Sequence, residues 1–299
     1  MPTPDCSTLA LVEGADQLLD VLELAHACPG DDDLGALRVA VLAPSLGRAR
    51  EQLRATVALA REEGLVVGWH EPRSGGASVA RTVRCLLDEL GPTRRLVVAD
   101  PFSGVPQVLV SLVRPTHLTV VDDGTATVEL VTHLAGLRLR RAAAPETRLR
   151  VFTKVALRAL EPADVEVRRN EHAWLRARWP RPEVHPGADL VGAPLVEAGE
   201  VDAPSYLSAV ERLVRQEGVT RYLAHRGESD AKLERVRLLG VDVVRPVLPL
   251  EVTLRRGPVG ESVIAFPSPG VHTLPLVLAG TGVRTYVCGV AEVQARAVC

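Results

Sequence analysis

The sequence predicts an α/β protein built from two doubly wound domains that face a central cleft. The chain has 299 residues, which exceeds one average domain. Short apolar strands alternate with helical periods in two separate stretches, which is typical of parallel sheets covered by helices on both faces. A proline-rich stretch lies between them, at residues 180–187. We therefore expect an N-terminal domain at residues 1–180 and a C-terminal domain at residues 187–299.

The first stretch alternates from residue 9 onward. Strands are expected at residues 9–12, 37–43, 65–69, 95–99 and 117–121, and helices at residues 17–26, 46–63, 78–90 and 105–113. From about residue 126 to residue 188 the periodicity weakens, and arginines cluster between Arg138 and Arg150. The cluster indicates either a solvated face or a surface that steers a polyanionic ligand.

Alternation resumes after the proline-rich stretch, which we interpret as a linker. Strands are expected at residues 189–192, 221–224, 241–244, 262–266 and 284–288, and helices at residues 205–217, 230–239, 250–255 and 271–278. In doubly wound sheets, ligands bind outside the carboxyl ends of the strands. Polar residues at those ends are therefore the candidates for a functional site.

Composition argues against several functional classes. The formal net charge of −2 gives no general attraction to nucleic acid or to an anionic membrane. No apolar stretch reaches transmembrane length, and we expect no signal peptide because the N-terminus lacks a basic start. The five cysteines are scattered without a Cys-x-x-Cys pair, which indicates reduced thiols and argues against a zinc site. The sequence also lacks the motifs of dinucleotide-binding, Walker-type, zinc-hydrolase and serine-hydrolase sites.

An acidic pair follows the strand expected at residues 117–121. Asp122 and Asp123 are followed by Gly124 and Thr125. One carboxylate of such a pair can act as a general base on an acceptor hydroxyl, because repulsion between neighbouring carboxylates raises the pKa of one of them. The alternative is a polar turn, which Asp and Gly favour.

Two histidines lie near strands of the second stretch. His225 and Arg226 follow the strand expected at residues 221–224. A histidine there could bind a phosphate or protonate a leaving group, and Arg226 could supply a second cation. Alternatively, His225 is a loop residue that caps the next helix. His185, which precedes Pro186, falls in the predicted linker and is not expected to belong to a site.

Two further candidates lie near the last strands. Ser268, in the sequence Pro-Ser-Pro-Gly, precedes a predicted helix, where its hydroxyl and backbone N–H groups such as that of Gly270 would make an anion site. Ser268 could instead be a plain N-cap. Glu251 begins a short predicted helix and could accept both hydroxyls of a ribose. The alternative for Glu251 is stabilisation of the helix dipole.

Taken in order, these residues resemble the motifs of the bacterial sialyltransferases, especially the lipooligosaccharide sialyltransferase and capsule polysialyltransferase group. Asp122 to Gly124 is similar to the family's [Asp/Glu]-[Asp/Glu]-Gly motif, whose acidic residue serves as the base. His225 falls where the histidine of the family's His-Pro motif contacts the CMP phosphate. Glu251 falls where a glutamate holds the ribose.

The resemblance extends over most of the chain. Ser268 with Thr273 is similar to the family's Ser/Thr motif, and Gly192 opens a Gly-Ala-Pro-Leu sequence that resembles the start of the nucleotide-binding half. The chain departs from the family's pattern at two positions, because Arg226 stands in place of the proline after the histidine, and Pro269 stands where a second hydroxyl is common.

The resemblance implies the GT-B fold, in which both domains are Rossmann-like. It implies a metal-independent, inverting transfer of a sialic acid or related nonulosonic acid from a CMP-sugar to a hydroxyl of a glycan or polysaccharide. Asp123, with Asp122 as the second choice, would be the base, and His225 would act on the departing phosphate. The residues implied to contact the nucleotide are His225, Arg226, Glu251, Ser268, Gly270, Thr273 and Gly192. The residues implied to contact the acceptor are Gly124 and Thr125.

We expect no cofactor, no metal ion, no nucleic-acid partner and no transmembrane segment. We expect a cytoplasmic protein, with peripheral association at the inner face of the membrane left open. Two alternative functions also remain open. One is a GT-B enzyme that uses a UDP- or GDP-sugar as a transferase or epimerase, and the other is a degenerate nucleotide-binding protein without catalysis.

Overall fold

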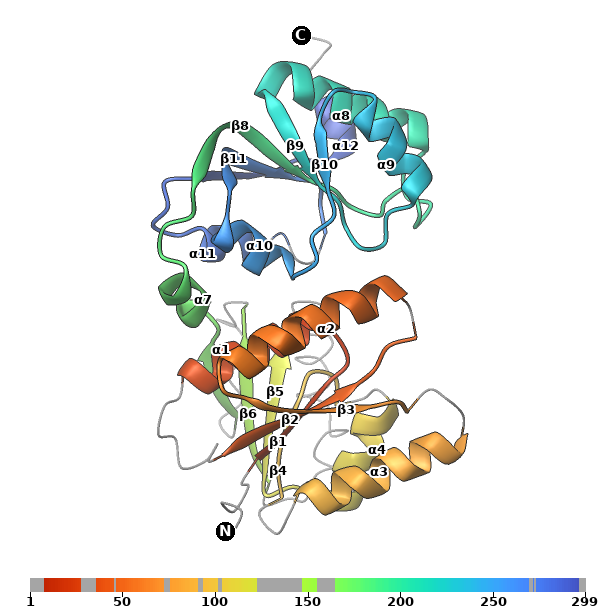
Figure 1. Ribbon diagram of the computed structural model, residues 1–299, viewed down its shortest axis with the longest axis vertical. Helices are drawn as coiled ribbons and strands as arrows, with labels where there is room; N and C mark the ends of the chain where they lie inside the picture. The colour runs from red at the N-terminus through yellow and green to blue at the C-terminus, as the bar shows by residue number, and fades with distance from the viewer. Residues whose placement is uncertain are drawn as a thin grey trace. The chain divides into compact units, whose positions relative to one another are not determined.

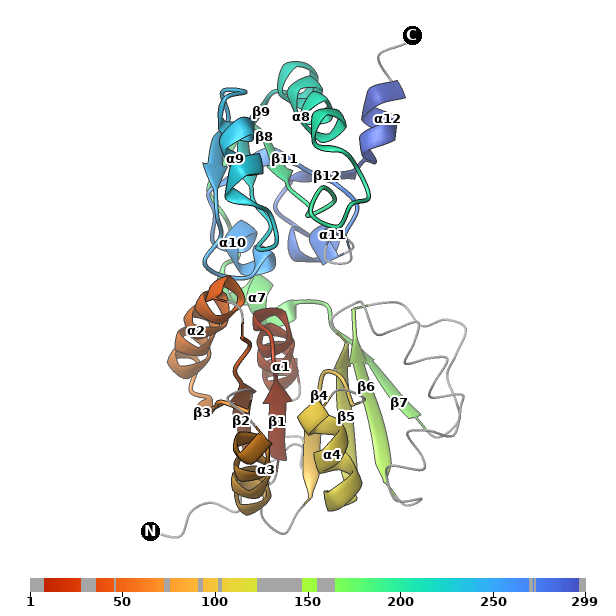
Figure 2. The same ribbon diagram turned by 90° about the vertical axis from the view of Figure 1, so that its right-hand side faces the viewer.

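The computed structural model describes residues 8–27, 36–45, 47–72, 76–90, 94–101, 104–122, 147–154, 165–268, 271 and 273–295. The chain divides into two compact units, Met1–Trp174 and Leu175–Cys299. Each unit contains one sheet whose strands all run parallel (Figures 1 and 2). The predicted fold class, two doubly wound parallel α/β domains, is confirmed.

The first unit has a seven-stranded sheet in the order β3-β2-β1-β4-β5-β6-β7, which Figure 2 shows edge to edge. Its strands are β1 Thr8–Val12, β2 Leu37–Leu42, β3 Val66–His70, β4 Arg95–Val98, β5 His117–Asp122, β6 Arg148–Thr153 and β7 Val165–Arg169. Its helices are α1 Ala15–Ala27, α2 Gly47–Glu62, α3 Gly76–Leu90 and α4 Gly104–Val113. Right-handed crossovers place α1 and α2 on one face of the sheet and α3 and α4 on the other (Figure 1).

Strands that are apolar at every position explain why this sheet forms. All five residues of β1 are buried, and its side chains alternate between the two covered faces. Leu9 and Leu11 pack with α3 and α4 residues such as Leu86 and Leu109 in one core cluster. The five strands and four helices predicted between residues 9 and 121 are all confirmed, with ends that differ by at most two residues.

Strands β6 and β7 and helix α7, Ala173–Arg178, were missed by the sequence analysis, which found only weak periodicity there. The reason is that β6 and β7 carry charges that are satisfied across the sheet. Arg150 on β6 lies opposite Glu166 on β7, and its Nε donates to Oε2 at 2.9 Å. Arg150 is buried, so the prediction that it lies on a solvated or ligand-steering face is wrong. Residues 138–141 lie outside the described residues.

The second unit has a five-stranded sheet in the order β10-β9-β8-β11-β12. Its strands are β8 Val184–Val191, β9 Val219–Leu223, β10 Asp242–Val244, β11 Val259–Ala265 and β12 Arg284–Val287. Its remaining helices are α8 Ala203–Glu217, α9 Asp230–Arg237, α10 Leu250–Arg256, α11 Leu274–Val277 and α12 Val290–Ala295. Helices α8, α9 and α12 lie on one face of the sheet and α10 and α11 on the other (Figure 1).

The predicted linker is partly a strand. Strand β8 begins at Val184 and therefore includes His185, Pro186 and Gly187. Proline is tolerated there because the first residues of β8 pair only with β11, whereas the register with β9 starts at Ala188. The interpretation of residues 184–187 as a linker is therefore wrong.

Local signals set the ends of α8. Asp202 is its N-cap, and its carboxylate accepts the N–H of Ser205 at 2.8 Å. Gly218 ends the helix in the left-handed conformation, with φ of 64°, which glycine adopts without steric cost. The chain then enters β9 directly at Val219.

Candidate functional site

The strand order of the second sheet creates a switch point between β8 and β11. The chain winds outward from β8 through β9 to β10, then crosses to β11 on the other side of β8. Ligands of doubly wound sheets bind outside the carboxyl ends of the strands at such a point. Gly192 follows β8, His225 follows β9, Glu251 follows β10 and Ser268 follows β11. The sequence candidates of this unit thus all lie in the segments that leave the carboxyl edge.

Glu251 and Thr273 are in direct contact. The Thr273 hydroxyl donates to Oε1 of Glu251 at 3.1 Å, and both residues are buried. Glu251 lies in the first turn of α10, and Thr273 immediately precedes α11. The contact joins two candidates that are 22 residues apart in the sequence, and it orients the carboxylate.

The α-helix predicted at residues 271–278 is shorter in the structure, and the anion-site role of Ser268 stays a prediction. Helix α11 begins at Leu274 and has four residues, with Thr273 as its N-cap residue. The predicted start at residue 271 is therefore three residues too early for the α-helix. Ser268 does not cap α11, and its carbonyl instead accepts the Val271 N–H in a turn, at 3.2 Å. A four-residue helix gives no appreciable dipole for an anion, and Gly270 lies outside the described residues.

His225 lies in a tight turn after β9. The Glu228 N–H donates to the carbonyl of His225 at 3.1 Å, and the Gly227 N–H donates to Nδ1 of the imidazole at 3.0 Å. The next helix, α9, is capped by Ser229, whose hydroxyl accepts the Lys232 N–H at 3.4 Å. The alternative in which His225 caps this helix is therefore wrong. Arg226 is exposed.

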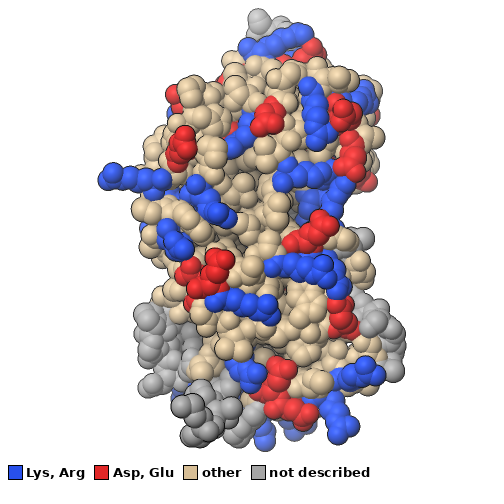
Figure 3. All heavy atoms as spheres, in the orientation of Figure 1, with Lys and Arg blue, Asp and Glu red and all other residues tan. Residues whose placement is uncertain are grey.

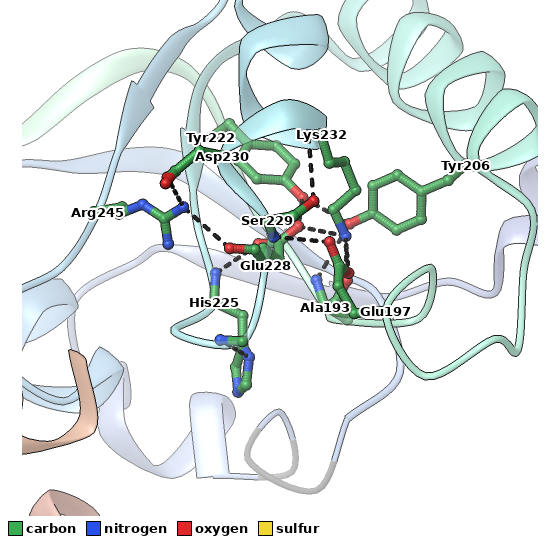
Figure 4. Close-up of polar contacts among 11 residues, drawn as sticks. Ala193, Glu197, Tyr206, Tyr222, His225, Glu228, Ser229, Asp230, Lys232 and Arg245 are labelled. Carbon is green, nitrogen blue, oxygen red and sulfur yellow. Dashed lines mark hydrogen bonds and ion pairs between the residues drawn. The ribbon is translucent and has the colours of Figure 1, made fainter. Parts of the chain in front are cut away.

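A buried polar network lies under this turn, as Figure 4 shows. Tyr222 donates to Oε1 of Glu228 at 2.5 Å, and the hydroxyls of Tyr206 and Tyr222 are 2.6 Å apart. The Lys232 ammonium lies 2.8 Å from Oε1 of Glu228 and donates to the carbonyl of Ala193 at 3.0 Å. The other oxygen of Glu228, Oε2, accepts the His225 N–H at 2.6 Å. The network therefore connects α8, β9 and α9 to the backbone of the turn.

Gly192 is required by this network. A Cβ added at Gly192 would lie 2.3 Å from the Tyr222 hydroxyl oxygen and 2.4 Å from Oε2 of Glu228. The next residue, Ala193, donates its N–H to the Tyr206 hydroxyl at 3.2 Å. The structure thus accounts for glycine at this position by the close packing of two side chains beside the end of β8.

Burial and hydrogen bonding shift the pKa values of this network in opposite directions. Burial raises the pKa of Glu228, although Lys232 opposes the shift. Burial also raises the pKa of Tyr222 well above its usual value. At Glu197, burial acts to raise the pKa, but hydrogen bonds from Ser229 and Lys232 outweigh it and lower the pKa to about 2. Glu197 is therefore a strong anionic partner for Lys232, with 2.9 Å between Oε2 and Nζ.

Sequence reasoning missed Glu228, Tyr222 and Lys232 as parts of the site. A signal for two of them was present, because Glu228 and Lys232 are four residues apart, the spacing of ion pairs on a helix. Their burial could not be read from the sequence, because it depends on Tyr206 and Tyr222 covering the carboxylate. Both tyrosines are completely buried.

The acidic motif of the first unit is only partly described. Asp122 is the last residue of β5 and lies opposite Thr153 of β6 in the register. It is therefore at the carboxyl edge of the first sheet, as predicted. Asp123, Gly124 and Thr125 lie outside the described residues, and the assignment of a base and of acceptor contacts to this motif stays a prediction.

A second buried polar cluster lies in the first unit and joins α1 to the segment that follows β7. Oδ1 of Asp20 lies 3.0 Å from the Lys154 ammonium and accepts the Asn170 amide at 2.9 Å. Glu23, one turn further along α1, accepts the Trp174 N–H at 3.0 Å. These contacts fasten the chain to α1 just before the unit ends at Trp174.

Among the described residues, no group of three or more His, Cys, Asp and Glu side chains could hold a metal ion. The expected independence of metal stays a prediction. In the described part of the chain, no helix is both long enough and apolar enough to cross a membrane. On the face drawn in Figure 3, basic and acidic side chains are interspersed over the described surface, in keeping with the small net charge of −2.

Comparison with known proteins gives similarity in structure alone. No protein-family model matches this chain, and no curated protein matches it in sequence. A candidate UDP-N-acetylglucosamine 2-epimerase from Listeria monocytogenes is similar in structure, with a TM-score of 0.56 and 13% identity over 90% of this chain and 76% of that one. The MnaA protein of S. aureus, solved with UDP, has a TM-score of 0.51 and 9% identity over 88% and 74% of the two chains.

A sialyltransferase from Photobacterium damsela also matches, with a TM-score of 0.47 and 10% identity over 94% of this chain and 74% of that one. At such identities these comparisons show the fold and nothing finer. The two matches with TM-scores above 0.5 support the expected GT-B fold, and membership of the sialyltransferase family is not shown.

Proposed function

We propose that this protein is a glycosyltransferase that transfers a sialic acid or related nonulosonic acid from a CMP-sugar to a glycan hydroxyl, with inversion and without a metal ion. The contact between Thr273 and Glu251 is the observation that supports the proposal most strongly. It brings together two residues that the sequence pattern assigns to the nucleotide, in the segments that follow β10 and β11.

The chemistry of that pair suits a ribose. A carboxylate can accept hydrogen bonds from both hydroxyls of a ribose, a recurrent contact in nucleotide-binding sheets. Thr273 donates to one oxygen of Glu251, and a carboxylate has about four lone-pair sites for hydrogen bonds. The contact with Thr273 thus orients the carboxylate that would accept the ribose hydroxyls.

The proposed contact for the phosphate of the leaving group is His225, which lies at the end of the neighbouring strand β9. Arg226 would add positive charge from the surface, and Ser268 would add a hydroxyl from the segment after β11. Hydrogen-bond donors and cations that are fixed before the reaction stabilise the charge that develops on a departing phosphate. A metal ion is not needed for such stabilisation.

The proposed base is Asp123, with Asp122 as the second choice. This assignment depends on the position of the pair after β5 and on the sequence motif. Asp123→Ala should reduce turnover roughly 10²–10⁴-fold, the usual contribution of a general base, while circular dichroism and nucleotide affinity stay unchanged. Wild-type turnover in the variant would refute the assignment.

A thermal-shift screen of cytidine, uridine and guanosine nucleotides, with and without a chelator, tests the proposal. At a concentration 100 times its dissociation constant a ligand stabilises the native state by about 2.7 kcal/mol, which corresponds to a rise in Tm of roughly 5–10 °C. We expect CMP to give this shift with chelator present. A shift with uridine or guanosine nucleotides alone would instead favour an enzyme of UDP- or GDP-sugars. Binding of CMP without transfer or hydrolysis of the donor would favour a non-catalytic nucleotide-binding protein.

A further inference from the structure

We propose that Glu228 is a positioning residue that holds His225 as a neutral hydrogen-bond donor, with the ring proton on Nε2, rather than as a general acid. The inference rests on the proposed function, because it specifies the form in which His225 meets the phosphate of the nucleotide. Three sets of contacts around the turn from His225 to Glu228 carry it.

The first contact selects the tautomer of the ring. Nδ1 of His225 accepts the Gly227 N–H at 3.0 Å. A ring nitrogen that accepts a hydrogen bond carries no proton, so the proton of the neutral ring is on Nε2. A doubly protonated ring has no acceptor nitrogen and would lose this hydrogen bond. The geometry of the turn therefore favours the neutral form with Nε2 as donor.

The second set of contacts fixes the backbone that carries the ring. Oε2 of Glu228 accepts the His225 N–H at 2.6 Å, while the Glu228 N–H donates to the His225 carbonyl at 3.1 Å. The same glutamate thus closes the turn with its side chain and with its backbone. Arg245, which follows β10, donates to the carbonyl of Glu228 at 3.0 Å and holds the turn from the neighbouring strand (Figure 4).

The third set of contacts holds Glu228 itself. Its Oε1 accepts the Tyr222 hydroxyl at 2.5 Å and lies 2.8 Å from the Lys232 ammonium, and Glu228 is completely buried. Rotation of the carboxylate would break these contacts inside a buried site, which is costly for a buried charge. The orientation of Oε2 toward His225 is therefore fixed by β9 and α9 together.

This arrangement has a chemical consequence. A neutral imidazole donates a hydrogen bond from Nε2 readily, but it would have to become an anion to give up that proton. His225 would therefore stabilise the leaving phosphate by hydrogen bonding and would not transfer a proton to it. A side chain that donates a hydrogen bond but cannot transfer a proton should therefore substitute for His225 without loss of this function. Glutamine is such a side chain, because its amide Nε2 can reach the position of the ring Nε2.

The position of the ring proton is testable without any ligand. Long-range ¹H–¹⁵N spectra and amide hydrogen exchange would be recorded for the wild-type protein, Glu228→Gln and Glu197→Gln. Glu197 is a matched control, because it contacts Lys232 at 2.9 Å and the Ser229 N–H at 2.8 Å, one residue beyond the turn. We expect an unprotonated, hydrogen-bonded Nδ1 at His225 and a protected Gly227 amide in the wild type and the control, and loss of both in Glu228→Gln.

Two results would overturn the inference at this stage. A proton on Nδ1 in the neutral wild-type ring would contradict the tautomer. A Glu228→Gln variant with unchanged His225 signals and unchanged Gly227 exchange would contradict the positioning role. The wild-type spectrum decides the tautomer even if the Glu228 variant does not fold.

Binding and turnover test the donor role. Calorimetry would give the affinity for CMP relative to cytidine in His225→Gln, His225→Ala and Glu228→Gln. We expect His225→Gln to keep this ratio within about threefold, and the other two to lower it about tenfold, the value of one hydrogen bond to a charged group. A general structural defect would weaken CMP and cytidine alike and leave the ratio unchanged. In transfer assays His225→Gln should keep turnover within roughly tenfold of wild type, whereas loss of a general acid would cost roughly 10²–10⁴-fold.

The outcomes separate this inference from the proposed function. If the wild-type protein binds none of the cytidine, uridine and guanosine nucleotides, the proposed function fails, and the spectra still decide the state of His225. If CMP binds and is used, but His225→Gln behaves like His225→Ala in both ratio and turnover, the donor role is refuted and the proposed function stands.

Discussion

Replacing Gly192 with alanine should destabilise the second unit by about 2–6 kcal/mol. The added Cβ would lie 2.3 Å from the Tyr222 hydroxyl oxygen and 2.4 Å from Oε2 of Glu228, so at least one of these buried groups must move. Overpacking of this kind costs about 1–3 kcal/mol. Separating Tyr222 from Glu228, or Glu228 from the His225 N–H, leaves a buried polar group unpaired and adds about 1–3 kcal/mol.

Amide hydrogen exchange of β8 and β9 measures this effect within the second unit, which avoids assuming that a chain of two units unfolds in one step. Gly289→Ala is a matched control in the same unit, because a Cβ at Gly289 has its nearest neighbour at 3.6 Å, an ordinary contact. We expect the exchange of β8 and β9 to accelerate strongly in Gly192→Ala and to stay near wild type in Gly289→Ala. Equal exchange in the two variants would refute the assignment of a tightly packed network beneath the turn.

Three further predictions concern other parts of the second unit. Asp189→Asn should cost about 3–5 kcal/mol, because Asp189 is completely buried and accepts two hydrogen bonds from the Arg221 guanidinium. A loss below about 1 kcal/mol, measured by amide exchange of β8 and β9, would contradict this. Glu251→Gln should weaken binding of cytidine and CMP by a similar factor of about ten, since one charged hydrogen bond to the ribose is lost, and a selective loss of CMP binding would place Glu251 at the phosphate instead. Against the effect of burial, hydrogen bonds lower the pKa of Glu197 from its ordinary value of 4.5 to about 2 in the folded protein. Because the folded value is the lower one, the stabilisation is present above pH 4.5 and is lost as the pH falls toward 2. Glu197→Gln should therefore flatten the acid limb of the stability profile.

Much of the fold could be predicted because its strands are apolar along their whole length. β1 and β2 contain almost only aliphatic side chains, and such strands imply a sheet covered on both faces. β6 and β7 could not be predicted in this way, because charged residues such as Arg150 and Glu166 alternate with apolar ones. Their charges are satisfied by each other across the two strands, a contact that only the register of the sheet makes visible.

The start of β8 was hidden for a different reason. Proline and glycine at positions 186 and 187 normally interrupt a strand. Here the missing N–H of Pro186 has no consequence, because β9 begins to pair with β8 only at Ala188. The residue at which a neighbouring strand begins to pair cannot be predicted from the sequence of β8 alone.

In the candidate site, as in the fold, individual residues could be predicted from the sequence, but the contacts between them could not. His225 and Glu251 could be proposed from their positions after predicted strands. The contact of Glu251 with Thr273 could not, because Thr273 was expected inside a helix of residues 271–278, whereas α11 begins at Leu274. Glu228 is only three residues after His225, but its position in the sequence is typical of a polar turn residue. Its burial depends on tyrosines contributed by two other elements.

The most direct test of the account is a hydrogen-exchange footprint of CMP on the intact protein with chelator present. The account predicts protection in the segments that follow the carboxyl ends of β8, β9, β10 and β11, around Gly192, His225, Glu251 and Thr273. Protection at the amino ends of these strands, or saturating CMP that leaves exchange unchanged throughout the second unit, would contradict it.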